Sequence, residues 1–159
     1  MKYVILLVIL LAGFPGISQR ITVAGQQYMD TTSISNAACS KALVAHYYSV
    51  EGKYPRSSDT LLREAQAFLK LQKQQYAGTG YVTFRFIINC AGHRLPRTQV
   101  LQTDASYQQT VFQPELVEAL YAFLQTLTEW QVAKSPGSVN YIAYLTFKMK
   151  NGEVVAMVP

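Results

Sequence analysis

Tyr81-Val-Thr-Phe-Arg-Phe-Ile-Ile-Asn89 is the stretch of sequence that decides the fold. Its apolar and polar side chains alternate: one face carries Val82, Phe84, Phe86 and Ile88, and the other carries Tyr81, Thr83, Arg85 and Asn89. A period of two residues is typical of a β-strand with one buried face. The stretch therefore predicts a strand that packs one of its faces on a hydrophobic core.

A helix is predicted farther along the chain, from Pro114 to about Trp130. Proline is favoured in the first turn of a helix. The apolar residues behind it recur at helical spacing, namely Leu116, Leu120, Phe123, Leu124 and Leu127. The polar positions Glu115, Glu118, Gln125 and Glu129 lie away from this stripe. We therefore expect the stripe to cover one face of the sheet, with Trp130 packed beneath it.

Two further β-rich runs end the chain, Tyr141 to Met149 and Glu153 to Val158. Asn151-Gly152 separates them, and this dipeptide is a strong signal for a two-residue hairpin turn. We expect the last run to pair with Val139 to Met149 and to cover its edge. A strand near Thr98 to Gln102 would pair with the first one. The predicted fold is α+β, an antiparallel sheet of three to four strands backed by helices.

The first half of the chain has weaker patterns. One helix is clear, because Leu61, Leu62, Ala65, Phe68 and Leu69 form an apolar stripe behind possible capping residues Ser58, Asp59 and Thr60. Ile21 to Ala24 predicts an edge strand or a loose arm, and Ser35 to Tyr48 favours a helix. The predicted division is a signal peptide over 1–18, an N-terminal segment over 19–53 and a domain over 54–159.

The first residues have the pattern of a secretory signal peptide. Lys2 supplies a positive charge, Val4 to Ala12 is an apolar run, and Pro15 to Ser18 provides small residues suited to cleavage after Ser18 or one residue later. The alternative is an uncleaved membrane anchor, but a spanning helix needs about 20 apolar residues and this run ends at Phe14. We therefore expect a periplasmic or secreted protein.

Cys39 and Cys90 are the only cysteines of the chain. An even count in an exported protein favours a disulfide. The alternative is two separate buried thiols, because free cysteine packs as a small hydrophobic residue.

The composition argues against nucleic-acid binding and against catalysis. The formal charge of +5, or +4 without Lys2, comes mostly from scattered lysines and arginines, whereas nucleic-acid binding calls for a denser basic face. Cys90 and His93 have a spacing that a metal could use, but zinc needs three or four ligands. A thiol enzyme using Cys90 with His46 or His93 would lack an orienting third group. We expect no catalytic residue, no metal and no cofactor, and no small-molecule substrate is evident.

The segment from Tyr54 to Lys150 resembles the C-terminal domain of TonB-type energy transducers, in the diverged form found among exported proteins of Bacteroidetes. The resemblance rests on Tyr54-Pro55, on Gly80 with the strand that follows, on Gly92, on the helix that leads to Trp130, and on Gly137 with the strand to Phe147. It implies an antiparallel sheet backed by helices and a role in protein binding. In the transducers, the last strand of the domain adds to an extended segment of an outer-membrane receptor.

By position, the corresponding strand in this chain is Val139 to Met149, and its candidate binding residues are Tyr141, Tyr144 and Phe147. The chain departs from the transducers in having no long spacer, an extra helix after Tyr54-Pro55, and the predicted covering strand Glu153 to Val158. The partner predicted is a protein or peptide, with a receptor segment as one candidate and a homodimer left open. The alternatives are a secreted structural or inhibitory domain and a small metal or thiol enzyme using Cys90 and His93.

Overall fold

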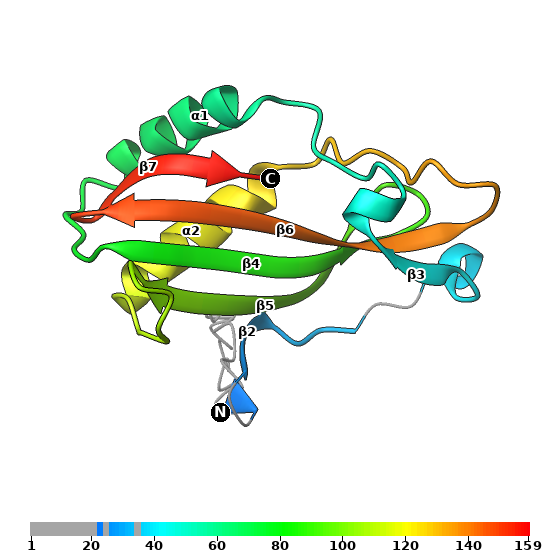
Figure 1. The fold of residues 1–159 in the computed structure, drawn as a ribbon, viewed down its shortest axis with the longest axis horizontal. Helices are drawn as coiled ribbons and strands as arrows, with labels where there is room; N and C mark the ends of the chain where they lie inside the picture. Colours follow the sequence, from blue (N-terminus) through cyan, green and yellow to red (C-terminus); the bar gives the residue numbers. More distant parts are fainter. Residues whose placement is uncertain (1–21, 24–25, 34–35) are drawn as a thin grey trace, which may run out of the picture.

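The computed structural model describes residues 22–23, 26–33 and 36–159, and these form one seven-stranded sheet with two α-helices (Figure 1). The elements in chain order are β1 (Thr22–Val23), β2 (Gln26–Asp30), η1 (Ala37–Cys39), β3 (Leu43–His46), η2 (Tyr47–Ser49), α1 (Ser58–Leu71), β4 (Gly80–Ile88), β5 (Arg94–Asp104), α2 (Pro114–Thr126), β6 (Val139–Lys150) and β7 (Glu153–Val158). The expected α+β class is confirmed, and the sheet has more strands than the predicted three to four. The expected signal peptide lies outside the described residues.

The sheet follows the order β1-β2-β5-β4-β6-β3, with β7 also paired to β6. All of these pairings are antiparallel except that of β3 with β6. The four strands β4 to β7 are those that the sequence predicted. The other strands come from the N-terminal segment, which extends both sides of the same sheet; of these, β1 lies at the sheet edge within Ile21 to Ala24, where an edge strand was one of the two expectations.

The expected helix over Ser35 to Tyr48 is wrong. In its place are two short 3-10 turns, η1 and η2, on either side of β3. Asn36 caps η1 by accepting a hydrogen bond from the backbone N–H of Ala38 at 3.0 Å. Pairing with β6, nearly a hundred residues away, gives β3 its conformation, and such long-range pairing overrides weak local preferences.

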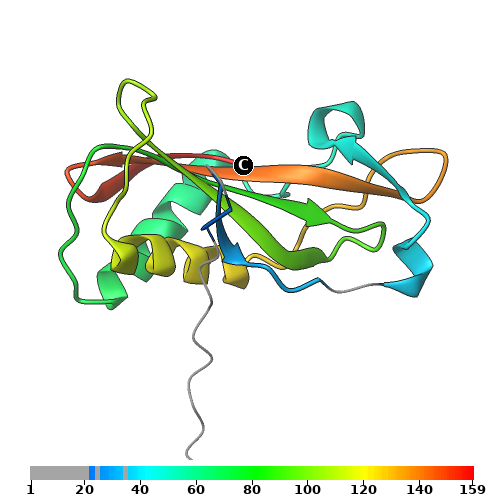
Figure 2. The ribbon, with the colours of Figure 1, turned by 90° about the horizontal axis from the view of Figure 1, so that it is seen from below.

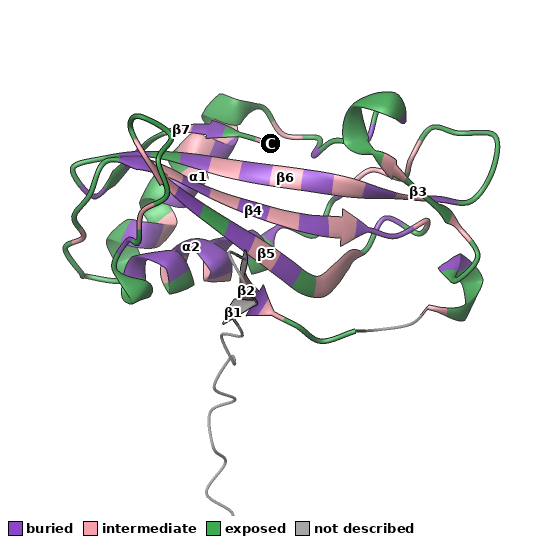
Figure 3. Ribbon diagram, turned by 60° about the horizontal axis from the view of Figure 1, so that its bottom comes forward, coloured by how far each residue is buried: buried purple, intermediate pink, exposed green. Residues whose placement is uncertain are grey.

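Helices α1 and α2 lie on one face of the sheet, and within the described residues no α-helix covers the other face, where only the short 3-10 turn η2 lies (Figure 2). Burial alternates strictly along β4 and along most of β6, as expected for strands with one covered face (Figure 3). The predicted core residues Val82, Phe84, Phe86 and Ile88 are all buried. The predicted stripe of α2 is buried against them, from Leu116 to Leu127. This part of the core is confirmed.

Both helix boundaries differ slightly from the prediction. The N-cap of α1 is Ser57, whose Oγ accepts a hydrogen bond from the N–H of Thr60 at 3.2 Å, one residue before the expected candidates. Helix α2 ends at Thr126 because Leu127 is already extended. Trp130 lies in the segment beyond the helix, buried between Tyr54 and Phe86, with its indole N–H donating to the carbonyl of Leu127 at 2.9 Å.

The predicted hairpin between β6 and β7 is confirmed. Asn151 has φ of 52° and Gly152 has φ of 82°, so both turn residues occupy the left-handed region of a type I′ turn. A Cβ atom on Gly152 would collide with the carbonyl of Tyr76, and its N–H donates to the carbonyl of Gly78 at 2.8 Å. The turn therefore needs glycine both for its backbone angle and for the close approach of the preceding loop.

One edge of β6 carries two different strands. Strand β7 pairs with Thr146 to Lys150, as the sequence predicted, and β3 pairs with Val139 to Ile142. The outer side of β7 faces α1, where the Gln66 amide donates to the carbonyl of Val154 at 2.8 Å. The strand edge that the TonB-type resemblance would offer to a partner is therefore occupied near both ends.

Candidate binding surface

The three predicted binding residues do not share a face. Tyr141 and Phe147 are fully buried on the covered face of the sheet, whereas Tyr144 is half-buried on the opposite face. The reason is strand periodicity, because positions an even number apart point the same way and position 144 is an odd number from both. The predicted surface of Tyr141, Tyr144 and Phe147 is therefore wrong as a set, and Tyr144 alone belongs to an accessible face.

Tyr141 has a structural role in the core. Its hydroxyl donates to the carbonyl of Gln131 at 2.6 Å, which ties the segment after α2 to β6. Burial raises the pKa of Tyr141 to about 12, because the charged phenolate would be poorly solvated there. Its ring also lies against Gly52, where a Cβ atom would come within 2.6 Å of it.

The uncovered face of β4, β5 and β6 is the candidate binding surface, and we call it the open face. Its outward positions are Tyr81, Thr83, Arg85 and Ile87 on β4, Gln99, Leu101 and Thr103 on β5, and Asn140, Ile142, Tyr144, Thr146 and Lys148 on β6. These side chains are half-buried or exposed. The face combines aromatic, aliphatic, hydroxyl, amide and cationic groups, and none of these outward positions holds Asp or Glu.

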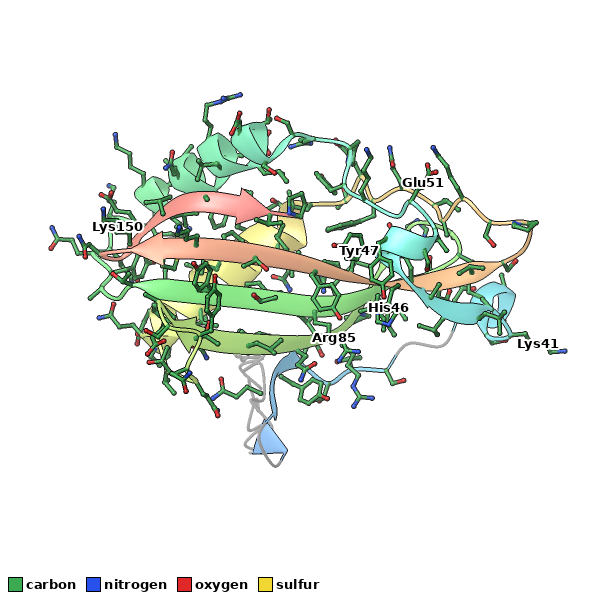
Figure 4. All side chains as sticks on the ribbon, in the orientation of Figure 1. Lys41, His46, Tyr47, Glu51, Arg85 and Lys150 are labelled. Carbon is green, nitrogen blue, oxygen red and sulfur yellow. A yellow bond between two sulfur atoms is a disulfide. The ribbon has the colours of Figure 1, made fainter. Side chains whose placement is uncertain are left out.

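An aromatic group lies where η2 crosses the open face. The ring of Tyr47 packs edge-on against Tyr144 at 6.2 Å and against Tyr48 at 5.5 Å, and His46 stacks on Tyr48 at 5.3 Å. Tyr48 is 70% exposed. Figure 4 shows His46, Tyr47 and Arg85 gathered on the side of the sheet away from α2. Tyr47 and Tyr48 are adjacent in the sequence, but their placement on this face depends on β3, which the sequence did not predict.

A second aromatic pair lies toward the other end of the open face. The rings of Tyr81 and Tyr107 stack at 5.0 Å with an angle of 9°, and their hydroxyls are 3.4 Å apart. The hydrogen bond to Tyr81 raises the pKa of the Tyr107 hydroxyl. Tyr107 is 71% exposed, so one side of the stacked pair remains available to solvent.

Two cations of the open face, Arg85 and Lys148, each lie beside one of these aromatic groups, and a third, Lys150, lies at the end of β6 opposite Glu153. In the pairing of β4 with β6, Arg85 is opposite Tyr144 and Lys148 is opposite Tyr81. Between them, Thr83 and Thr146 are opposite each other with their hydroxyls 3.0 Å apart. The Arg85 guanidinium donates to the Gln99 amide oxygen at 3.3 Å. No ion pair within the described part of the chain includes Arg85 or Lys148.

The predicted disulfide between Cys39 and Cys90 is confirmed, with Cα atoms 5.6 Å apart. It ties η1, just before β3, to the turn between β4 and β5. Asn140 reinforces this link, because its amide oxygen accepts from the N–H of Cys90 at 2.8 Å and its amide group donates to the carbonyl of Cys39 at 3.4 Å. These contacts hold β3 and the aromatic group after it in place on β6.

The disulfide also bears on the alternative of a metal or thiol enzyme. Cys90 has no thiolate to act as nucleophile or metal ligand, and His93 is exposed at the turn. A search of the described ranges finds no cluster of three or more His, Cys, Asp or Glu side chains that could hold a metal ion. The disulfide therefore occupies the Cys90 sulfur that a metal or thiol site with His93 would need.

A hollow of about 680 Å³ lies away from the open face, between the C-terminal end of α1 and the hairpin of β6 and β7. Four of its ten lining residues carry amide side chains, namely Gln66, Gln74, Gln75 and Asn151, and Gln66 is already bonded to β7; Lys70 and Glu153 are the charged residues of the lining. Its groups do not converge on a reactive centre. We therefore take the open face as the candidate functional surface.

Comparison of the chain with protein-family models, with curated proteins and with solved structures gave no significant match. Within the described residues, neither helix has the length and apolar character needed to cross a membrane.

Proposed function

We propose that this chain is an exported, non-enzymatic protein-interaction domain of the cell envelope, related in kind to the receptor-binding domain of TonB-type transducers. The observation that carries the proposal is the open face, where exposed aromatic and cationic side chains lie on a rigid sheet. Tyrosine and arginine are enriched in protein interfaces, because they combine a large contact area with hydrogen-bonding groups. The proposed partner is a protein or peptide, and a segment of an outer-membrane receptor is one candidate.

Exposed apolar residues on the open face and at its edge also support protein binding. Leu101 is 43% exposed on β5, and Val158 is 63% exposed at the end of β7, opposite Thr146. Apolar groups that gather beside aromatic rings on one face are typical of an interaction surface, whereas isolated ones are common on any protein. We propose that contact occurs through these side chains, because β3 and β7 limit strand addition at β6.

The disulfide is consistent with the proposed location. Disulfides persist in oxidising compartments such as the periplasm and the extracellular space, and they are rare in the cytosol. With the signal-like N-terminus, this supports export to the periplasm or beyond.

The proposal can be tested by retention of envelope proteins on the immobilised protein, followed by their identification and by direct binding of each purified candidate. We expect a specific partner whose binding is weakened at least about tenfold by the double variant Tyr48→Ala/Tyr107→Ala, which removes two exposed rings. Val111→Ala/Val132→Ala is the matched control, because both valines are exposed elsewhere. The proposal would be refuted if no envelope protein bound, or if the partner found bound the tyrosine variant and the valine variant with equal affinity.

A further inference from the structure

We propose that the open face binds an extended acidic segment of its partner, with two carboxylates four residues apart. This inference rests on the proposed function and specifies the chemistry of the partner. It follows from the placement of Arg85 and Lys148, from the absence of carboxylates among the outward positions, and from the apolar residues around them.

The two cations define a fixed spacing. Lys148 lies opposite Tyr81, and Tyr81 precedes Arg85 by four residues on β4. The two cations are therefore offset by four residues along the strand direction. A strand rises about 3.3 Å per residue, so the two positions are about 13 Å apart along the sheet. A segment in extended conformation places every second side chain on the same side, so its residues i and i+4 would reach both cations at once.

The groups between the cations suit the same ligand. The paired hydroxyls of Thr83 and Thr146 lie midway, where the side chain of residue i+2 would approach them. Hydroxyls both donate and accept hydrogen bonds, so they accommodate a polar side chain or the backbone of the segment. The stacked pair Tyr81 and Tyr107 and the group around Tyr144 flank the path at its two ends.

The charge of the face favours an anionic ligand. The ion pairs found between described residues lie elsewhere and join Arg56 with Glu64 and Glu129, and Lys134 with Glu51. Within residues 22–23, 26–33 and 36–159, neither Arg85 nor Lys148 has a carboxylate partner to give up when a ligand binds. An incoming carboxylate would gain attraction from each cation without breaking an existing pair.

The apolar residues favour a protein segment over an acidic polysaccharide. Leu101 is exposed on β5, and Val158 is exposed beside Thr146 on β7. Aliphatic side chains of a peptide can cover these groups and gain from removing them from water. Sugar hydroxyls would need hydrogen-bonding partners at the same positions.

The test uses the purified protein and a labelled synthetic peptide, Thr-Glu-Val-Thr-Val-Glu-Thr with blocked ends, measured by fluorescence anisotropy at low salt. Its control is an isomer with the second Glu moved one position nearer the first, which turns the two carboxylates to opposite sides of an extended chain. We expect the first peptide to bind more tightly, and Arg85→Gln/Lys148→Gln to weaken its binding about tenfold.

The matched control variant is Arg63→Gln/Lys70→Gln, which makes the same change in net charge on the exposed side of α1. We expect its affinity to change less than about twofold, because screened charges far from the ligand contribute little. Equal losses in both variants, or equal binding of both peptides, would overturn the inference. Tighter binding of polygalacturonate, lost with the same two cations, would overturn it in favour of a polysaccharide.

The two proposals fail in distinguishable ways. If the partner found with envelope proteins binds Arg85→Gln/Lys148→Gln as well as the unchanged protein, the acidic-segment inference is wrong while the protein-interaction proposal stands. If no envelope protein binds, the proposed function is wrong, and the peptide experiment still decides whether the open face selects spaced carboxylates.

Discussion

The two faces of the sheet use aromatic residues in different ways. On the covered face, Phe84 and Phe147 pack edge-on at 5.9 Å and are fully buried. On the open face, Tyr81 and Tyr107 stack with one ring largely exposed, and Tyr48 is exposed in the aromatic group toward the other end of that face. Residue type distinguishes the faces poorly, because tyrosine occurs on both. Position along the strand and coverage by helices decide which ring belongs to the core and which is available to a partner.

The largest expected effect comes from deleting residues 151–159, which tests whether β7 completes the covered face. Val154 and Met157 are buried, so their loss should lower the free energy of unfolding by about 4 kcal/mol or more. The deletion also uncovers the edge of β6, which should promote self-association. Chemical unfolding and analytical ultracentrifugation measure these effects. A truncated protein that is monomeric and equally stable would show that β7 is a passive extension.

Trp130→Ala tests the covered face at its main aromatic contact. The indole lies between Tyr54 and Phe86 at centroid distances of 4.8 and 5.1 Å, so removing it should leave a cavity. We expect a loss of about 3 to 5 kcal/mol in the free energy of unfolding. Urea titration monitored by circular dichroism provides the measurement. A change within about 0.5 kcal/mol would assign Trp130 to the surface.

Replacing both cysteines, as Cys39→Ala/Cys90→Ala, tests whether the disulfide anchors the aromatic group on the open face. The bridge closes a sequence separation of 51 residues, and its loss should cost about 2 to 4 kcal/mol. The local effect should be greatest at β3 and η2, which should exchange amide protons faster than β4. Hydrogen exchange read by mass spectrometry would detect this difference. Uniform acceleration across the sheet would argue against local anchoring of the aromatic group.

Tyr141→Phe isolates one polar contact within the covered face. It leaves the carbonyl of Gln131 without its hydrogen bond, and we expect a loss of about 0.5 to 1.5 kcal/mol. In the unchanged protein, Tyr141 keeps its proton up to about pH 12, whereas an unfolded tyrosine ionises near pH 10. Its contribution to stability is therefore complete below about pH 10 and is lost as pH rises toward 12. The fall in stability over this range should be smaller in Tyr141→Phe, and an identical fall in both proteins would exclude Tyr141 as its source.

Tyr48→Ala should have the smallest effect on folding. The ring is 70% exposed, so the free energy of unfolding should change by no more than about 0.5 kcal/mol. Thermal denaturation with Trp130→Ala as reference makes the comparison between faces direct. A loss as large as that of Trp130→Ala would mean that the aromatic group on the open face is part of the core.

The sequence predicted those elements whose pattern is local and periodic. The alternation of β4, the stripe of α2 and the Asn151-Gly152 turn each depend on residues a few positions apart, and each appears in the structure. Strand β3 was missed because four residues carry too little periodicity to distinguish a strand from a helix. Tyr141 and Phe147 lie in the core because their strand parity, and not their aromatic character, decides which face of β6 they join.

By itself, the sequence determined the α+β class, the main strands and helices and the hairpin, and it favoured a disulfide between the two cysteines. The first three follow from residue period and turn chemistry, whereas the structure decided between the disulfide and two separate thiols. Only the tertiary structure decided that the N-terminal segment joins the sheet, that β3 shares the edge of β6 with β7, and that Arg85, Lys148 and the tyrosines form one open face. The reason is physical, since each of these features depends on contacts between residues far apart in the chain, and no local pattern encodes which distant surfaces will bury one another.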